Sequence, residues 1–418
     1  MGDKSKLAIN GGAKAITHPL PARGSMDYRE KAAVDALFDN AIANGTCIGY
    51  GGPEEDALCK EWAAYMGGGY ADGVNAGTNA VYVALRALDL EPFSEVIVGP
   101  VTDPGGIMPI VMCCCIPVVA DAEKGKYNTC AEEIEKMITP LTRAIVVPHI
   151  AGEPVDMVKV MAVAKKYNLK VVEDCAQAHH AKLNGQLVGT FGDIAAISTM
   201  FGKHSNTGGQ GGIVFTKNED LYWKVRQSSD RGKPFGLPAG ASNCCANINS
   251  NLNEIGCAIG RVQLKKLPEF VEGRQRVAKK LIEGFKNIPS VEVPEVVEGG
   301  EHSYWFWRLR FNGEGLSCTK AEYVAALAAE GLSVSPTYPA LPHQFDWFKN
   351  KKAFGSNGFP WSCSEYKGQY GMDAWFETPN AVEAIANCFQ FYFFESYRDC
   401  DIEMILNAFA KVDAAFRG

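Results

Sequence analysis

Residues 144–176 read AIVVPHIAGEPVDMVKVMAVAKKYNLKVVEDCA and contain two apolar runs separated by an amphipathic one. The apolar runs, 144–150 and 170–176, are short and rich in valine, which is typical of buried strands. Between them, residues 156–168 repeat apolar side chains at helical spacing. A strand, a helix and a strand in this order predict a βαβ unit with two parallel strands.

The same alternation continues on both sides of this stretch. Apolar, β-branched runs recur at 95–100 and 116–122, and residues 80–90 carry a helical pattern. This arrangement predicts an α/β fold with a mostly parallel sheet that helices cover on both faces. Farther on, residues 253–288 form one long helical pattern, in which Pro268 is expected to kink or break the helix.

The pattern changes after residue 286. Residues 303–311, SYWFWRLRF, predict a strand, and residues 319–332 predict a helix, so this part is expected to be α+β. A chain of 418 residues is also longer than one hydrophobic core normally serves. We therefore expect a large domain over 1–286 and a smaller C-terminal domain over 287–418.

Composition narrows the classes of partner and location. A formal net charge of −7 argues against a nucleic-acid partner. No run reaches the roughly 18 apolar residues of a membrane-spanning helix, so no membrane partner is expected. The fourteen cysteines include the adjacent sets 113–115 and 244–245 and lack the paired spacing of a disulfide framework or a zinc site. They indicate reduced thiols in a cytoplasmic protein.

Polar residues follow two of the predicted strands, and ligands bind at the carboxyl ends of strands in open α/β sheets. Gly77 and Thr78 stand between a strand and a helix, where free N–H groups and a hydroxyl suit an anion, although an ordinary helix cap has the same sequence. Asp174 and Gln177 lie at the end of a second such strand, the apolar run that begins at residue 170. A carboxylate there needs a cation or hydrogen-bond donors, as in a helix cap or a buried ion pair.

A third strand end lies in residues 198–216, STMFGKHSNTGGQGGIVFT, where an apolar run leads to Lys203. A desolvated lysine has a lowered pKa and attacks carbonyl carbons, whereas a lysine on the surface of a glycine-rich loop has no such role. His179 and His180 suggest metal ligands, but no third ligand stands at a convincing spacing. We therefore expect no metal site.

These three strand ends together match the needs of pyridoxal phosphate. The lysine forms the Schiff base, the acid keeps the pyridine nitrogen protonated, and the helix start holds the phosphate. The sequence thus predicts pyridoxal phosphate as the cofactor.

Ordered motifs make the chain resemble the DegT/DnrJ/EryC1/StrS family of sugar and cyclitol aminotransferases over nearly its whole length. NAGTNAVYVAL (75–85) resembles the phosphate segment S-G-T-x-A-L, and VVEDCAQAHHA (171–181) resembles E-D-A-A-Q-A-H-G-A. GDIAAISTMFGK (192–203) is similar to G-D-x-x-x-F-S-x-x-x-x-K, and residues 247–270 are similar to the family segment N-Y-R-M-S-E-x-Q-A-A-x-G-x-x-Q-L. The resemblance implies the aspartate-aminotransferase-like fold, known as fold type I.

The resemblance also implies a role for each matching residue. Lys203 would bind the cofactor and shuttle a proton, Asp174 would pair with the pyridine nitrogen, and Gln177 would lie beside the ring hydroxyl. The phosphate would be held by three residues, Gly77, Thr78 and Ser198. Asn249 would reach the phosphate of the neighbouring subunit, which implies a homodimer with shared active sites.

The chain departs from the family pattern in the loop after Lys203, which has one residue more than usual. Counting back from the glycines lands on His204, the position at which some relatives carry histidine and perform dehydration. Counting forward from Ser198 lands on Lys203, and we favour this count because a strand fixes its spacing while a glycine loop absorbs insertions.

A second departure is Asp103, which stands where the family places an aromatic side chain on the cofactor ring. Three interpretations remain: a neighbouring segment covers the ring, Asp103 contacts the substrate amine or a sugar hydroxyl, or T-D-P-G-G is only a turn. Residues 335–348 resemble the family's substrate-side segment, which makes Tyr338 and His343 candidate substrate contacts.

The expected activity is transfer of an amino group from glutamate or glutamine to a keto-sugar or keto-cyclitol. Two alternatives remain. One is a pyridoxal-phosphate-dependent sugar dehydratase, in which His204 faces the cofactor. The other is a non-catalytic or regulatory family member, which the missing aromatic residue and the altered glycine loop suggest.

Overall fold

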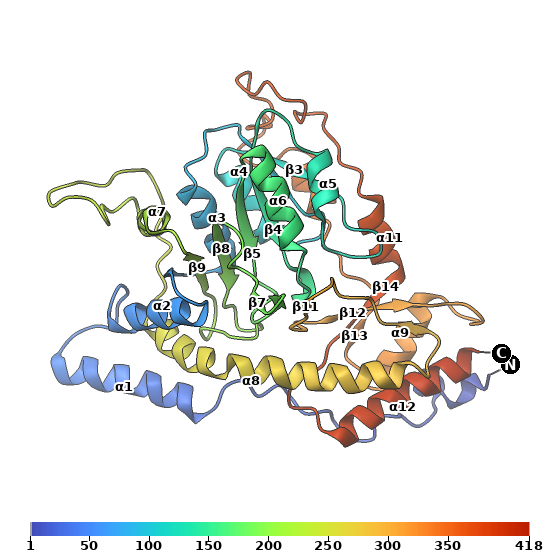
Figure 1. Ribbon diagram of the computed structural model, residues 1–418. Coiled ribbons are helices and arrows are strands. Elements are labelled where there is room, and N and C mark those ends of the chain that lie inside the picture. The colour runs from blue at the N-terminus through green and yellow to red at the C-terminus, as the bar shows by residue number, and fades with distance from the viewer. Residues whose placement is uncertain (1, 418) are drawn as a thin grey trace.

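The computed structural model describes residues 2–417 and is organised around a seven-stranded sheet (Figure 1). In spatial order its strands are β1 (Tyr70–Val74), β9 (Gly212–Thr216), β8 (Ile194–Ser198), β5 (Lys170–Asp174), β4 (Thr142–Pro148), β2 (Glu95–Val98) and β3 (Ile116–Val119). β9 runs antiparallel to both of its neighbours, and the pairs from β8 to β3 are parallel. The predicted α/β fold with a mostly parallel sheet is confirmed.

Helices cover both faces of this sheet, as the alternating residues of β8 show. Ala196 belongs to the core that includes α3, whereas Ala195 and Ile197 belong to the core that includes α2 and α8. Because both faces are buried, the strands consist mostly of apolar residues. The helices of this part are α1 (Tyr28–Asn44), α2 (Pro53–Tyr65), α3 (Gly77–Ala87), α4 (Pro104–Met112), α5 (Ala131–Lys136), α6 (Met157–Tyr167), α7 (Glu219–Ser229) and α8 (Glu254–Phe285).

The long helix α8 continues through Pro268, so the break that was one of the two expectations does not occur. Proline removes one backbone donor inside a helix, but packing on both sides of it holds α8 in place. Leu267 and Val271 lie in the core below the large sheet, and Leu281 lies in the core of the second sheet. α8 therefore joins the two cores as one continuous helix (Figure 1).

The second sheet has four antiparallel strands in the order β10 (Val291–Glu292), β12 (Trp307–Phe311), β14 (Cys388–Phe391) and β13 (Val334–Ser335). Its core also contains Leu7 and Ile16 from the start of the chain. Conversely, Phe348 and Trp361 pack into the core of the large sheet. Segments from both sides of residue 287 thus share each core, and the domain division there stays a prediction.

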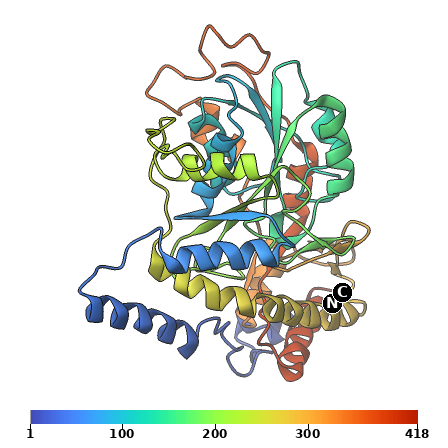
Figure 2. The same cartoon turned by 60° about the vertical axis from the view of Figure 1, so that its left-hand side comes forward.

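The remaining elements are short or peripheral. Three strands form a third small sheet, β11 (Gly300–Glu301), β6 (Lys182–Leu183) and β7 (Gln186–Leu187), and the helices of the second half are α9 (Lys320–Ala329), α10 (Asp346–Lys349), α11 (Pro379–Asn387) and α12 (Asp399–Phe416). Figure 2 shows α1 extending away from the large sheet along α8, and the two termini side by side. Within residues 2–417, no helix combines the length and the apolar character needed to cross a membrane.

Candidate active site

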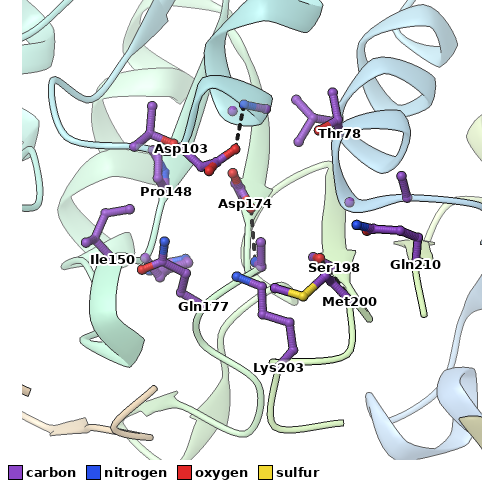
Figure 3. Close-up of a pocket in the computed structure, with 18 residues that line it drawn as sticks. Thr78, Asp103, Pro148, Ile150, Asp174, Gln177, Ser198, Met200, Lys203 and Gln210 are labelled. Atoms are coloured by element: carbon purple, nitrogen blue, oxygen red, sulfur yellow. Dashed lines mark hydrogen bonds between the residues drawn. The ribbon is translucent and has the colours of Figure 1, made fainter. Parts of the chain in front are cut away.

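A pocket of about 240 Å³ opens at the carboxyl ends of the parallel strands (Figure 3). Eighteen residues line it. They come from the segments that follow β1, β2, β4, β5 and β8, together with Gln210 of the glycine loop. The lining includes seven residues that the sequence singled out: Gly77, Thr78, Asp103, Asp174, Gln177, Ser198 and Lys203.

The start of α3 brings free backbone donors to the pocket. The N–H groups of the first turn of any helix lack intrahelical acceptors, and the N-cap residue here, Ala76, offers them no side-chain acceptor either. Gly77 allows the helix to approach β8 closely, because a Cβ there would lie 2.4 Å from Ser198 Cβ. An uncapped helix start with the positive end of its dipole toward the pocket suits a phosphate group.

Asp174 is the last residue of β5 and is 7% exposed. Its Oδ1 accepts a hydrogen bond of 3.0 Å from the Ala176 N–H. Its Oδ2 lies beside Gly106, where an added Cβ would be only 3.0 Å away. Burial raises the pKa of Asp174, and the Ala176 N–H and the Lys203 ammonium oppose this change. A protonated nitrogen beside Oδ2 would therefore stabilise the carboxylate.

Lys203 lies across the pocket from Asp174 and is also buried (Figure 3). Burial lowers the pKa of its amine to about 8, and the carboxylates of Asp174 and Asp103 act in the opposite direction. More of this amine is uncharged near neutral pH than in an ordinary lysine, which makes it a better nucleophile. The lysine expected from the sequence thus has the environment that the expected chemistry needs.

Gln177 is held on both sides of its amide group. Its Oε1 accepts from the Ala151 N–H at 2.8 Å, and its Nε2 donates to the Tyr338 hydroxyl at 2.9 Å. Tyr338 therefore contacts a lining residue without lining the pocket itself. His343 lies farther off, with its Nε2 3.3 Å from Thr378 Oγ1.

Asp103 lies at the rim of the pocket and is exposed. Its Oδ1 accepts from the Gly105 N–H at 2.9 Å and so caps α4. The side chain thus serves the local turn and also lines the pocket (Figure 3). Within the described part of the chain, no phenylalanine, tyrosine or tryptophan lines this pocket, and His149 is the one lining residue with an aromatic ring.

His204 and Asn249 do not belong to the pocket lining formed by residues 2–417. His204 is fully buried, and its Nε2 lies 2.9 Å from the Ser303 carbonyl oxygen. Asn249 is exposed on the segment between α7 and α8, where it pairs with Asp230 through the backbone. Of Lys203 and His204, only Lys203 therefore lines the pocket.

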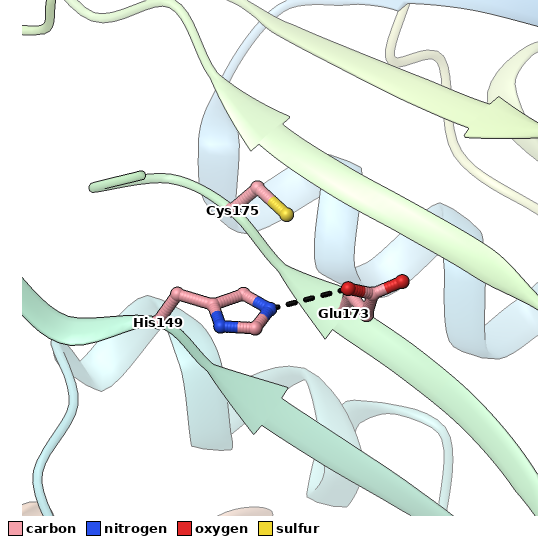
Figure 4. Close-up of side chains that lie close together, drawn as sticks. All are labelled: His149, Glu173 and Cys175. Atoms are coloured by element: carbon pink, nitrogen blue, oxygen red, sulfur yellow. Dashed lines mark hydrogen bonds and ion pairs between the residues drawn. The ribbon is translucent and has the colours of Figure 1, made fainter. Parts of the chain in front are cut away.

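His149 is a pocket residue that the sequence reasoning missed. It follows β4 and is fully buried. Its Nδ1 accepts from the Val155 N–H at 3.0 Å, so its Nε2 carries the proton and donates to Glu173 Oε2 at 3.2 Å. Cys175 lies beside this pair (Figure 4). Because both nitrogens of the imidazole have partners, the hydrogen bonds alone account for this cluster. The sequence signal that could have identified His149 is its position directly after an apolar strand.

The sequence profile of the DegT/DnrJ/EryC1/StrS aminotransferase family matches residues 29–381. The chain belongs to this family. It is 33% identical over 284 residues to the GDP-perosamine synthase of Caulobacter vibrioides, and this match covers 67% of this chain and 74% of that protein. It is also 33% identical over 300 residues to the UDP-N-acetyl-3-dehydro-alpha-D-glucosamine 3-aminotransferase of Acidithiobacillus ferrooxidans, covering 72% of this chain and 78% of that one.

A solved aminotransferase from Psychrobacter cryohalolentis superimposes with a TM-score of 0.80 at 26% identity, and the match covers 96% of this chain and all of the other. The protein is thus an aminotransferase that depends on pyridoxal phosphate. The pocket fits this cofactor: an uncapped helix start suits its phosphate, a buried acid suits its ring nitrogen, and a buried amine suits its carbonyl.

The close approach of α3 to β8 yields a prediction about Gly77. We expect Gly77→Ala to weaken binding of pyridoxal phosphate by at least about ten-fold, because the new methyl group collides with Ser198 and moves the helix start. Spectroscopic titration with the cofactor measures this. Gly209→Ala is the matched control, since an added Cβ there meets nothing within 4 Å. Equal affinities in both variants would contradict the proposed phosphate site.

Proposed function

We propose that this enzyme transfers an amino group from glutamate or glutamine to a keto-sugar or keto-cyclitol, with Lys203 and Asp174 as its catalytic residues. The observation that carries the proposal is the meeting of a buried amine, a buried carboxylate and an uncapped helix start in one pocket. The two bacterial relatives are named for nucleotide sugars, which favours a keto-sugar acceptor.

Each of these groups has a separate task. When bound, pyridoxal phosphate supplies a carbonyl that takes up the amino group and a ring that withdraws electrons from the neighbouring carbon. The N–H groups of the α3 start, the Thr78 hydroxyl and Ser198 bind the phosphate. Asp174 keeps a proton on the ring nitrogen, and Gln177 lies beside the ring hydroxyl.

Lys203 serves twice in this proposal. Its uncharged amine holds the cofactor until the substrate amine displaces it, and the freed amine then moves the proton between the substrate carbon and the cofactor. A lysine whose pKa is about 8 suits both tasks, since it gains and loses a proton near neutral pH. The position of Lys203 in the pocket, with His204 outside it, supports transamination over the dehydratase alternative.

Borohydride reduction of the loaded enzyme followed by peptide mapping tests the assignment of Lys203. We expect the phosphopyridoxyl group on Lys203 alone, and Lys203→Ala should lower transamination by at least about a thousand-fold. Lys351 is an internal control, because burial lowers its pKa to about 8 as well, although it lies outside the pocket. Label on Lys351 or another lysine, with Lys203 unlabelled, would refute the site.

Asp103 provides a test of acceptor binding. An ionised carboxylate accepts hydrogen bonds from sugar or cyclitol hydroxyls more strongly than a neutral group does, and this one lies at the rim of the pocket. We propose that Asp103 orients the acceptor.

We expect Asp103→Asn to lower kcat/KM for the acceptor by about ten-fold, because a charged hydrogen bond becomes neutral. The half-reaction with the amino donor should change less. Asparagine still caps α4, so the melting temperature should hold. Asp103→Phe should likewise impair the acceptor half-reaction while leaving cofactor binding intact. Equal losses in both half-reactions would instead assign Asp103 to the turn alone.

We further propose a homodimer in which Asn249 reaches the phosphate in the partner subunit. Asn249 is exposed and does not line the pocket of its own chain. Helix α1, which extends from the body (Figure 2), carries exposed apolar side chains, with Ile42 77% and Phe38 49% exposed. A second copy of the chain would bury them. We also propose a cytoplasmic location, which the fourteen free thiols support.

Mixed dimers test this arrangement. Lys203→Ala and Asn249→Ala should each be nearly inactive alone, and co-refolding equal amounts should restore about a quarter of the parental activity, because hybrid dimers hold one intact site. A mixture that stays inactive, while light scattering shows dimers, would place Asn249 outside the shared site. A monomer in light scattering would refute the dimer itself.

A further inference from the structure

The side chain of Lys203 rests on the face of an indole ring. Its Nζ lies 3.7 Å from the ring centroid of Trp305. Trp305 comes from the segment just before β12, about a hundred residues later in the chain, and it does not line the pocket. Its Nε1–H donates to the Gly202 carbonyl oxygen at 3.0 Å, so the ring is fixed to the residue that precedes the lysine.

The side chain of Arg23, which does not line the pocket, holds the backbone of the lysine loop. Arg23 donates to the carbonyl oxygens of Lys203 and His204, at 2.6 Å each. Its Nε also bonds to Glu395 Oε1 at 3.1 Å. Arg23 therefore couples the backbone of the lysine to the partly buried carboxylate of Glu395.

The same carboxylate fixes the segment of Trp305. Glu395 Oε2 accepts from Arg274 Nε at 2.9 Å, and Arg274 Nη1 donates to the carbonyl oxygens of Tyr304 and Trp305 at 2.6 and 3.1 Å. Arg274 is almost fully buried. Two distant segments, one with the lysine and one with the indole, are thus held to a single carboxylate.

A further contact joins Trp305 to the pocket side. The backbone N–H of Trp305 donates to the Ala151 carbonyl oxygen at 2.8 Å, and the Ala151 N–H donates to Gln177 Oε1. The indole is therefore fixed through its ring, its carbonyl oxygen and its N–H. A ring held this firmly presents its face to Lys203 at little cost in side-chain entropy.

The indole face solves a problem that the proposed reaction creates. A lysine ammonium released in this pocket would be attracted to Asp174, which acts on it already. An ion pair between them would occupy the carboxylate that the ring nitrogen needs. An indole attracts an ammonium through its π electrons, yet it offers neither a charge nor a lone pair that would compete for the proton.

We propose that Trp305 is a positioning residue that holds the ammonium of Lys203 whenever the lysine is not covalently bound, which leaves Asp174 free for the ring nitrogen. The proposal rests on the proposed function of Lys203. It predicts that holding the ammonium requires the aromatic face of Trp305, in addition to the bulk of this side chain and its hydrogen bond to Gly202.

The pKa of Lys203 in the full-length protein without added cofactor tests this role. Competitive acetylation across a pH series, read by peptide mass spectrometry, follows Lys203 directly, with Lys351 as reference in the same sample. Loss of an attraction for the charged form favours the neutral amine, so we expect Trp305→Leu to lower the pKa of Lys203 by about 1. Trp305→Phe keeps an aromatic face and should lower it much less. Lys351 should not change in either variant.

Tetrafluorotryptophan at position 305 keeps the shape and the N–H of the indole but withdraws its π electrons, so it applies the same test where Trp305→Leu fails to fold. It should lower the pKa of Lys203 as the leucine variant does. An unchanged pKa in the leucine and fluorinated proteins, or an equal fall in the phenylalanine variant, would refute the role of the ring. The labelling does not require turnover, so its failure would leave the borohydride mapping of Lys203 intact, and a failed mapping would leave the labelling result intact.

Discussion

A carboxylate and an amine that are both buried in one pocket, those of Asp174 and Lys203, impose the main constraint on this structure. Burial disfavours the charged form of both groups, as the raised pKa of the acid and the lowered pKa of the lysine indicate. Two such groups persist in a pocket only where the surrounding chain supplies compensating partners. The Ala176 N–H serves the acid and the Trp305 ring serves the amine, so the strand ends and loops around them must be held rigidly.

The fold supplies that rigidity through backbone contacts. His179 accepts from the Ser205 N–H through Nδ1, and its Nε2 donates to the Ser198 carbonyl oxygen, which secures the loop between the strand and the lysine. Arg23 secures the same loop from outside. The close approach of Gly77 to Ser198 then sets the helix start beside this loop. Groups that follow five strands are in this way brought to one pocket.

The sequence alone predicted the parts of this site that are local. Lys203, Asp174 and the helix start at Gly77 each follow an apolar run, and the rule that ligands bind at the carboxyl ends of strands brings them together. The same rule covers His149, whose position after β4 went unused. Trp305 could not be found in this way, because it comes from a distant segment and no periodicity reports which loop it packs against.

Predictions that rested on a single residue, without the packing around it, were less accurate. Proline alone argued for a break in α8, but the helix is held by packing on both sides of that residue, and tertiary contacts outweigh a single lost hydrogen bond. His204 was likewise ambiguous by counting. The structure buries it beside the Ser303 carbonyl oxygen, whereas Lys203 lines the pocket. The central claim is that Asp174 holds a proton on the cofactor ring, and nuclear magnetic resonance of the enzyme loaded with ¹⁵N-pyridine-labelled pyridoxal phosphate tests it most directly. The account predicts a protonated ring nitrogen at neutral pH in the parent and an unprotonated one in Asp174→Asn; a nitrogen that stays protonated in both would contradict it.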